Sequence, residues 1–180
     1  VQYVSLSDSI LETFNRHIAY KEENFDSFIP QLDEALENNQ KVLLVCNRVK
    51  NAKTLFNRIE ELYPDINKML IHSRYKRVDR NNLEKRLIEE FNKSLKACIA
   101  VSTQVVEVSL DISFDLMITE TAPIDALIQR FGRINRKRNA TTIGKYKPVC
   151  VIAPPENKNE CLPYSLEILT ETFRVLPDKE

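Results

Sequence analysis

Three arginines repeat at three-residue intervals in one short run of this chain. They are Arg130, Arg133 and Arg136, beside Gln129 and Gly132, and Gly132 is one of only two glycines in 180 residues. On a helix or a tight turn, this spacing aims successive guanidinium groups in similar directions. Like charges placed in this way repel one another unless an anion or a carboxylate neutralises them. A triphosphate is such an anion, and guanidinium binds it in bidentate fashion. The alternative is a solvated basic helix end that favours the helix dipole.

A second polar segment, 102–112, comes directly after a short apolar run. A hydroxyl at a strand end can bind a nucleic-acid phosphate together with the exposed backbone N–H groups beyond it. Gln104 lies in the same segment, and Asp111 stands further on, where its carboxylate can accept a hydrogen bond from a ribose hydroxyl. The alternative is an ordinary loop with two buried polar side chains.

A third segment, 72–77, is basic and contains Tyr75. Cations surround this one aromatic residue, at Arg74, Lys76, Arg77 and Arg80. Such a group can grip a phosphate backbone and stack on a base, or it is a solvated helix start whose charges pair with Glu84. Asn47 follows an earlier apolar run, where its side chain can cap the following helix.

Short apolar runs alternate with amphipathic segments along the chain. The runs predict strands over 41–46, 68–72, 97–101, 115–119 and 147–153. The amphipathic segments predict helices from about 27, over 47–63 and 79–93, from 123, and over 166–173. In the helix from 123, the inward residues are predicted to be Ile124, Leu127, Ile128 and Phe131. This alternation favours an α/β fold with an open parallel sheet and helices on both faces. Ligands bind such sheets at the carboxyl ends of the strands, where the polar segments fall.

The domain organisation is predicted in three parts. Residues 1–24 are expected to be a linker and short helix from a preceding domain, 25–155 the α/β domain, and 156–180 a polar linker with a short C-terminal helix. The chain opens on Val1 rather than Met, so we expect a fragment of a longer protein.

The composition limits the kinds of partner. The formal net charge is zero, so contact with nucleic acid requires a local patch rather than a global field. No apolar run approaches the roughly 20 residues of a membrane span, and we expect a cytoplasmic protein with no membrane partner. The cysteines form no CxxC pair, so buried thiols and no metal site are expected at Cys46, Cys98, Cys150 and Cys161.

Two parts of an NTPase are absent from the sequence. No phosphate-binding G-x-x-x-x-G-K-[ST] loop occurs, and no acidic pair after an apolar strand could hold Mg²⁺. The chain alone is therefore expected not to hydrolyse ATP.

The arginine run resembles the sixth motif of superfamily 2 helicases, Q-R-x-G-R-x-x-R. The resemblance implies that Arg133 and Arg136 are arginine fingers that reach the γ-phosphate across an interdomain cleft. It implies that Gln129 couples the nucleotide to the opposite lobe, and that Arg130 holds local structure.

Other segments resemble further motifs of the same helicases. Segment 102–112 is similar to the fifth motif, although many relatives have Arg-Gly where this chain has Val108 and Ser109. By that resemblance Thr103 and Gln104 contact the nucleic-acid backbone and Asp111 contacts the nucleotide ribose. Further nucleic-acid contacts are implied at Asn47, Ser73 and Arg74.

Residues 40–139 as a whole resemble the helicase of type I CRISPR systems. The resemblance implies a second RecA-like lobe, ATP-driven 3′-to-5′ movement on single-stranded DNA, and ATP with Mg²⁺ held mainly by a missing first lobe. It also implies an HD nuclease domain or subunit and a guide-RNA surveillance complex as partners. Two alternatives stay open: another superfamily 2 DNA helicase, and a non-catalytic nucleic-acid-binding adaptor module with a RecA-like fold.

Overall fold

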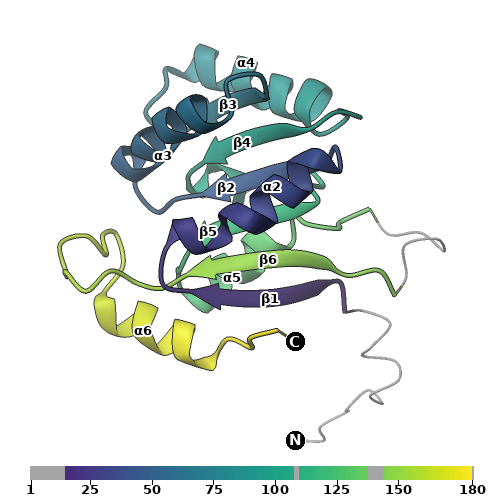
Figure 1. Cartoon of the computed structure of the whole chain (residues 1–180). Helices are drawn as coiled ribbons and strands as arrows, with labels where there is room; N and C mark the ends of the chain where they lie inside the picture. Colours follow the sequence, from purple (N-terminus) through teal and green to yellow (C-terminus); the bar gives the residue numbers. More distant parts are fainter. Residues whose placement is uncertain (1–14, 108–109, 138–143, 180) are drawn as a thin grey trace, which may run out of the picture.

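The computed structural model describes residues 15–107, 110–137 and 144–179, and within them six parallel strands form one open sheet. The strand order is β1-β6-β5-β2-β4-β3 (Figure 1). The strands are β1 (His17–Glu22), β2 (Lys41–Val45), β3 (Asn67–Ile71), β4 (Cys98–Ser102), β5 (Leu116–Glu120) and β6 (Lys147–Ile152). The prediction of an α/β fold with an open parallel sheet is confirmed.

Helices cover both faces of this sheet. Strand β2 illustrates why, because Val42 and Leu44 pack in one apolar cluster while Leu43 and Val45 pack in another. The first cluster lies under α2 (Ile29–Glu37) and α3 (Val49–Leu62). The opposite face carries α4 (Arg77–Arg86) with its π-helical continuation (Leu87–Phe91), α5 (Ile124–Phe131) and α6 (Leu166–Val175). Short 3₁₀ turns span Phe25–Phe28 and Gln104–Glu107.

The predicted linker and short helix over 1–24 is wrong for its last part, because His17–Glu22 is strand β1 of the sheet. It pairs with β6 from His17 opposite Lys147 to Glu22 opposite Ile152. This edge strand is polar and buries only Ala19, so it lacks the continuous apolar run that reveals a central strand. Residues 1–14 lie outside the described residues.

The C-terminal segment packs against the sheet. Helix α6 begins after Ser165, whose hydroxyl accepts the backbone N–H of Ile168, and it buries Leu169. The Lys21 ammonium of β1 donates to the carbonyls of Phe173 and Leu176 near the helix end, at 3.2 and 2.9 Å. The predicted short helix is confirmed, and it belongs to the same packed unit as the sheet. No helix of the described ranges is both long and apolar enough to cross a membrane.

Candidate nucleotide and nucleic-acid site

The predicted nucleic-acid residues lie at the carboxyl edge of the sheet. Loops leave the carboxyl ends of parallel strands on the same side, so the residues after β2, β3, β4 and β5 meet there. A direct contact joins two of these loops, because the side-chain amide of Gln104 donates to the carbonyl of Asn47 at 2.7 Å. This edge holds Asn47, Thr103 and Gln104, whereas Asp111 and Arg136 lie beside Ser113, at the amino end of β5.

Arg130 is fully buried and ties three of these loops together. Its guanidinium donates to the carboxylate of Glu107 (2.8 Å), the hydroxyl of Thr119 (2.8 Å) and the side-chain carbonyl of Asn47 (2.9 Å). A fourth hydrogen bond goes to the backbone carbonyl of Glu120 at 3.0 Å. We call these five residues the Arg130 cluster. The contacts match the local structural role expected for Arg130.

Helix α5 buries a different face from the predicted one, and Arg130 lies on that buried face. Ile124 and Ile128, predicted to point inward, are 48% and 60% exposed, whereas Arg130 is 0% exposed. The spacing of apolar residues cannot predict that an arginine is buried, because a charged side chain is buried only where other residues supply hydrogen-bond partners. The prediction for Ile124 and Ile128 is wrong for that reason.

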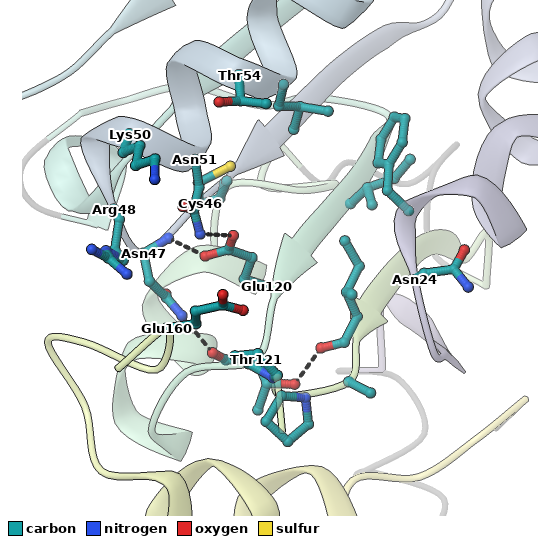
Figure 2. Close-up of a pocket in the computed structure, with 18 of the residues that line it drawn as sticks. Asn24, Cys46, Asn47, Arg48, Lys50, Asn51, Thr54, Glu120, Thr121 and Glu160 are labelled. Carbon is teal, nitrogen blue, oxygen red and sulfur yellow. Dashed lines mark hydrogen bonds between the residues drawn. The ribbon is translucent and has the colours of Figure 1, made fainter. Parts of the chain in front are cut away.

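Asn47 lies within a polar network at the mouth of a cavity of about 470 Å³. Figure 2 shows Glu120 accepting the backbone N–H of Asn47 at 2.6 Å and the side-chain amide of Asn51 at 2.7 Å. The Asn47 amide donates to the carbonyl of Thr121 at 2.7 Å. Asn47 is not the helix cap, because α3 is preceded by Arg48 and has no side-chain cap. Sequence reasoning missed Glu120, whose one signal is a carboxylate at the end of an apolar strand.

Arg133 is buried within the lobe rather than presented at its surface. Its guanidinium donates to the backbone carbonyls of Val106 (2.8 Å), Glu107 (2.8 Å) and Leu110 (2.6 Å), and the residue is 5% exposed. Burial lowers the pKa of Arg133, with nearby Arg136 acting in the same direction and Asp111 against it. The guanidinium therefore anchors the loop after β4 without a carboxylate among its hydrogen-bond partners.

Arg136 and Asp111 lie side by side in the open. Their side chains are 41% and 70% exposed, and the guanidinium nitrogen is 3.3 Å from the carboxylate. The backbone N–H of Arg136 also donates to the hydroxyl of Ser113 at 3.0 Å. The structure thus brings together the predicted second finger and the predicted ribose contact. Gln129 is exposed on α5 and lines a shallow hollow with Arg133.

The predicted nucleic-acid residues differ in their accessibility. Ser73 and Arg74 are exposed, whereas Thr103 is buried and its hydroxyl has no hydrogen-bond partner. His72, before Ser73, is buried and stacks on Tyr75 with ring centroids 4.2 Å apart. Burial, Lys53 and Arg74 all lower the pKa of His72, against the opposing effect of its own backbone carbonyl.

The described residues include no grouped metal ligands and no paired cysteines. Across the described ranges, no three His, Cys, Asp or Glu side chains are grouped as metal ligands would be. All four cysteines are free and buried, as predicted. Burial raises the pKa of Cys98 to about 11 and of Cys150 to about 12, so both are protonated, unreactive thiols near neutral pH.

The sequence of this chain matches a known protein family. Residues 38–139 match the model of the C-terminal region of the CRISPR-associated nuclease/helicase Cas3. The Cas3 endonuclease/helicase of Escherichia coli K12 is 36% identical over 73% of this chain. A putative Cas3 nuclease/helicase of Methanocaldococcus jannaschii is 33% identical over 91% of it. The chain spans only 15% and 22% of the length of these two relatives.

Solved structures agree on the fold. The crystal structure of T. fusca Cas3 with AMPPNP superposes with a TM-score of 0.76 at 21% identity, covering 88% of this chain and 21% of that one. The C-terminal domain of the DEAD-box protein Dbp5 superposes at 0.57 and 16% identity, covering 91% and 86%. Both carry the RecA-like sheet. The chain belongs to the Cas3 family of CRISPR-associated nuclease/helicases, of which it forms the C-terminal RecA-like lobe.

Proposed function

We propose that this chain is the second lobe of a helicase that moves along single-stranded DNA at the expense of ATP during CRISPR interference. The observation that carries the proposal is the exposed pair of Arg136 and Asp111, next to a buried Arg133 that anchors the loop bearing Thr103 and Gln104. Nucleotide contacts and DNA contacts thereby share one short segment of chain.

Arg136 is the arginine finger that can reach a nucleotide without first giving up buried hydrogen bonds. An exposed ion pair contributes less than about 1 kcal/mol, so Arg136 can leave Asp111 for a γ-phosphate at little cost. Asp111 is then free to accept a hydrogen bond from the ribose. The guanidinium would neutralise charge that develops on the transferring phosphoryl group.

Arg133 is a finger only after it gives up its present partners. Three backbone carbonyls hold its guanidinium, and all of them belong to residues 106–110. A triphosphate offers stronger, charge-assisted acceptors, so it can compete for this group. Loss of these three hydrogen bonds would loosen the loop that begins at Thr103. The nucleotide state would in this way affect how tightly the lobe binds DNA.

ATP and Mg²⁺ would be held mainly by a first lobe of the same protein, because the phosphate loop and acidic pair do not occur in this sequence. The residues of this chain fit the complementary role, since they offer guanidinium groups and a ribose acceptor. The chemistry that ATP supplies is cleavage of its γ-phosphoryl bond, and Gln129 would relay the closure of the two lobes.

The partners follow from the same relatives, which are named nuclease/helicases. One similar chain belongs to a CRISPR RNA-guided surveillance complex in a pre-nicking state, with a TM-score of 0.72, 21% identity, and coverage of 92% of this chain and 24% of that one. We therefore place this lobe beside an HD nuclease domain or subunit, in the cytoplasm, recruited by a guide-RNA complex.

The test is Arg136→Ala in the full-length helicase. DNA-stimulated ATP hydrolysis should fall on the order of 10³-fold, while ATP binding persists. The matched control is Arg174→Ala on α6, which also breaks an exposed pair with a carboxylate, that of Glu171. Control turnover should equal wild type. Normal ATP turnover by Arg136→Ala would refute the finger assignment.

The adaptor alternative has one observation in its favour, the sequestration of Arg133 by backbone carbonyls. An adaptor would bind DNA with an affinity that no nucleotide changes. Measuring DNA affinity of the full-length protein with and without a non-hydrolysable ATP analogue separates the two functions.

A further inference from the structure

A cavity of about 470 Å³ opens at the carboxyl ends of β2, β5 and β6 (Figure 2). It is the cavity at whose mouth Asn47 lies. Cavities of roughly 300–1,000 Å³ that combine an apolar lining with a few convergent polar groups are the usual sites of small ligands. The pair of Arg136 and Asp111 lies at the other end of β5, beside Ser113, so this cavity is separate from the proposed nucleotide contacts.

The cavity lies at the position in the sheet where open α/β folds bind ligands. Strands β2 and β5 are neighbours, yet the chain leaves β2 for α3 on one face of the sheet and leaves β5 for α5 on the opposite face. Ligands of such sheets bind outside the carboxyl ends of the strands, at the point where the connections diverge in this way. Residues that follow both strands line the cavity.

The interior of the cavity is apolar. Its lining includes Ile118 and Ile152 of the sheet, Leu55 of α3 and Phe25 of the first 3₁₀ turn. Cys46 also lines it and is 2% exposed. Burial, followed by the charge of Glu120, raises the pKa of this thiol well above its ordinary value, against the effect of Arg130, so the thiol is uncharged near neutral pH. The interior therefore suits the faces of an uncharged ring.

Glu120 and Asn51 form a polar edge of the cavity. The Glu120 carboxylate accepts the backbone N–H of Asn47 at 2.6 Å on one oxygen and an amide N–H of Asn51 at 2.7 Å on the other (Figure 2). Each oxygen can accept a further hydrogen bond, and no ion pair of the described residues includes Glu120. The second amide N–H of Asn51 has no acceptor among the described residues. The edge thus presents one donor followed by two acceptors.

This order complements the edge of one nucleobase. Guanine presents O6, N1–H and its 2-amino group side by side, which is one acceptor followed by two donors. Adenine and cytosine have an acceptor nitrogen beside their amino group, and thymine has its N–H between two carbonyls. A guanidinium ion offers two parallel donors, but it has no acceptor for the Asn51 N–H and no ring to occupy the apolar interior.

The charges at the rim do not favour or oppose a phosphate group on the ligand. Arg48 and Lys50 line the cavity together with Glu23 and Glu160, so two cations stand against two carboxylates. The remaining cation of the lining, Arg58, already pairs with a carboxylate outside it. Recognition therefore depends on the base and not on what the base carries.

We infer that this cavity binds a free guanine nucleoside or nucleotide by its base. The N1–H and 2-amino groups donate to the two oxygens of Glu120, and O6 accepts the second amide N–H of Asn51. The apolar side chains of α3 and the sheet contact the ring. Such binding requires no ATP turnover and is independent of the finger role of Arg136.

The experiment is isothermal titration of the full-length helicase with GMP, IMP and AMP, in the presence of a saturating non-hydrolysable ATP analogue that occupies the interlobe site. IMP lacks the 2-amino group and should bind about tenfold more weakly than GMP. AMP should bind at least about 100-fold more weakly, because its N1 lone pair would face a Glu120 oxygen. Guanosine should bind as GMP does. Equal affinity for GMP and AMP, or no binding of GMP, would overturn the guanine site.

Variants locate the binding. Glu120→Gln exchanges one acceptor for a donor, so it should weaken GMP binding more than about tenfold and remove most of the preference over AMP. Leu55→Trp should fill the cavity and abolish GMP binding. The matched control is Leu62→Trp, which lies on the same helix outside the cavity at a residue that is 45% exposed, and it should bind GMP as wild type does.

The comparison of the three nucleotides on wild type needs no variant, so it decides the matter even if Leu55→Trp does not fold. Undiminished GMP binding by a folded Leu55→Trp protein would place the nucleotide elsewhere and overturn the site. Displacement of GMP by oligothymidine that contains one guanine, but not by oligothymidine alone, would assign the cavity to a base of the DNA strand and overturn the free ligand.

Discussion

Replacing Arg130 by methionine should destabilise the lobe severely. The guanidinium makes four hydrogen bonds of 2.8 to 3.0 Å, one of them to the carboxylate of Glu107, whose side chain is 14% exposed. Methionine fills a similar volume but leaves these acceptors unpaired and the Glu107 charge uncompensated. Removal of one member of a buried pair costs about 3–5 kcal/mol. In a domain of this size, the melting temperature should fall by roughly 6–20 °C.

The assay is urea or thermal unfolding followed by circular dichroism, and the controls locate the effect. Arg174→Met removes an exposed arginine paired with Glu171 and should leave the unfolding transition unchanged. Arg130→Lys should recover only part of the loss, because lysine keeps the charge near Glu107 but cannot span the other acceptors. If Arg130→Met lost less than about 1 kcal/mol, the Arg130 cluster would not be the buried junction described above.

Three smaller predictions concern the backbone and the thiols. Gly132 has φ −58°, and an added Cβ would lie 3.3 Å from the Gln129 carbonyl oxygen, so Gly132→Ala should change the unfolding free energy by less than about 1 kcal/mol. Asn135→Ala should destabilise clearly in the same urea titration, because φ is 51° there and the side chain donates to two backbone carbonyls. Equal stability of the two variants would contradict this assignment. Cys98 and Cys150 should resist iodoacetamide at pH 8 in the native lobe and react once urea unfolds it, as read by mass spectrometry. Rapid labelling of the folded lobe would contradict their burial.

The sequence predicts the central strands well because they are buried on both faces. Continuous apolar runs reveal β2 and β4, and three-residue and four-residue spacings reveal the helices. Strand β1 was not predicted, because an edge strand with one buried residue has no continuous apolar run. The order of the strands is also invisible, since pairing of β1 with β6 joins residues about 130 positions apart.

The sequence indicates which residues to consider for the site, but it does not predict how their side chains are arranged. The spacing of Arg130, Arg133 and Arg136 suggests three similar groups, yet one is fully buried, one is anchored to carbonyls and one is exposed. The difference arises because Arg130 meets the side chains of Glu107, Thr119 and Asn47, whereas Arg133 meets three backbone carbonyls, and the spacing of the arginines encodes neither set of partners. The glycine beside them does not require a special conformation, and the left-handed residue of the run is Asn135.

The outer side of β1 has a consequence for how this sheet meets other proteins. An edge strand offers unpaired N–H and carbonyl groups, which invite a foreign strand to join. Here the N–H of Lys21 donates to the Asp178 carboxylate at 3.0 Å, and the carbonyl of Ala19 accepts the N–H of Lys179 at 2.7 Å. The chain thus occupies its own β-addition site, so this border is protected against edge-to-edge aggregation for as long as its last described residues stay in place.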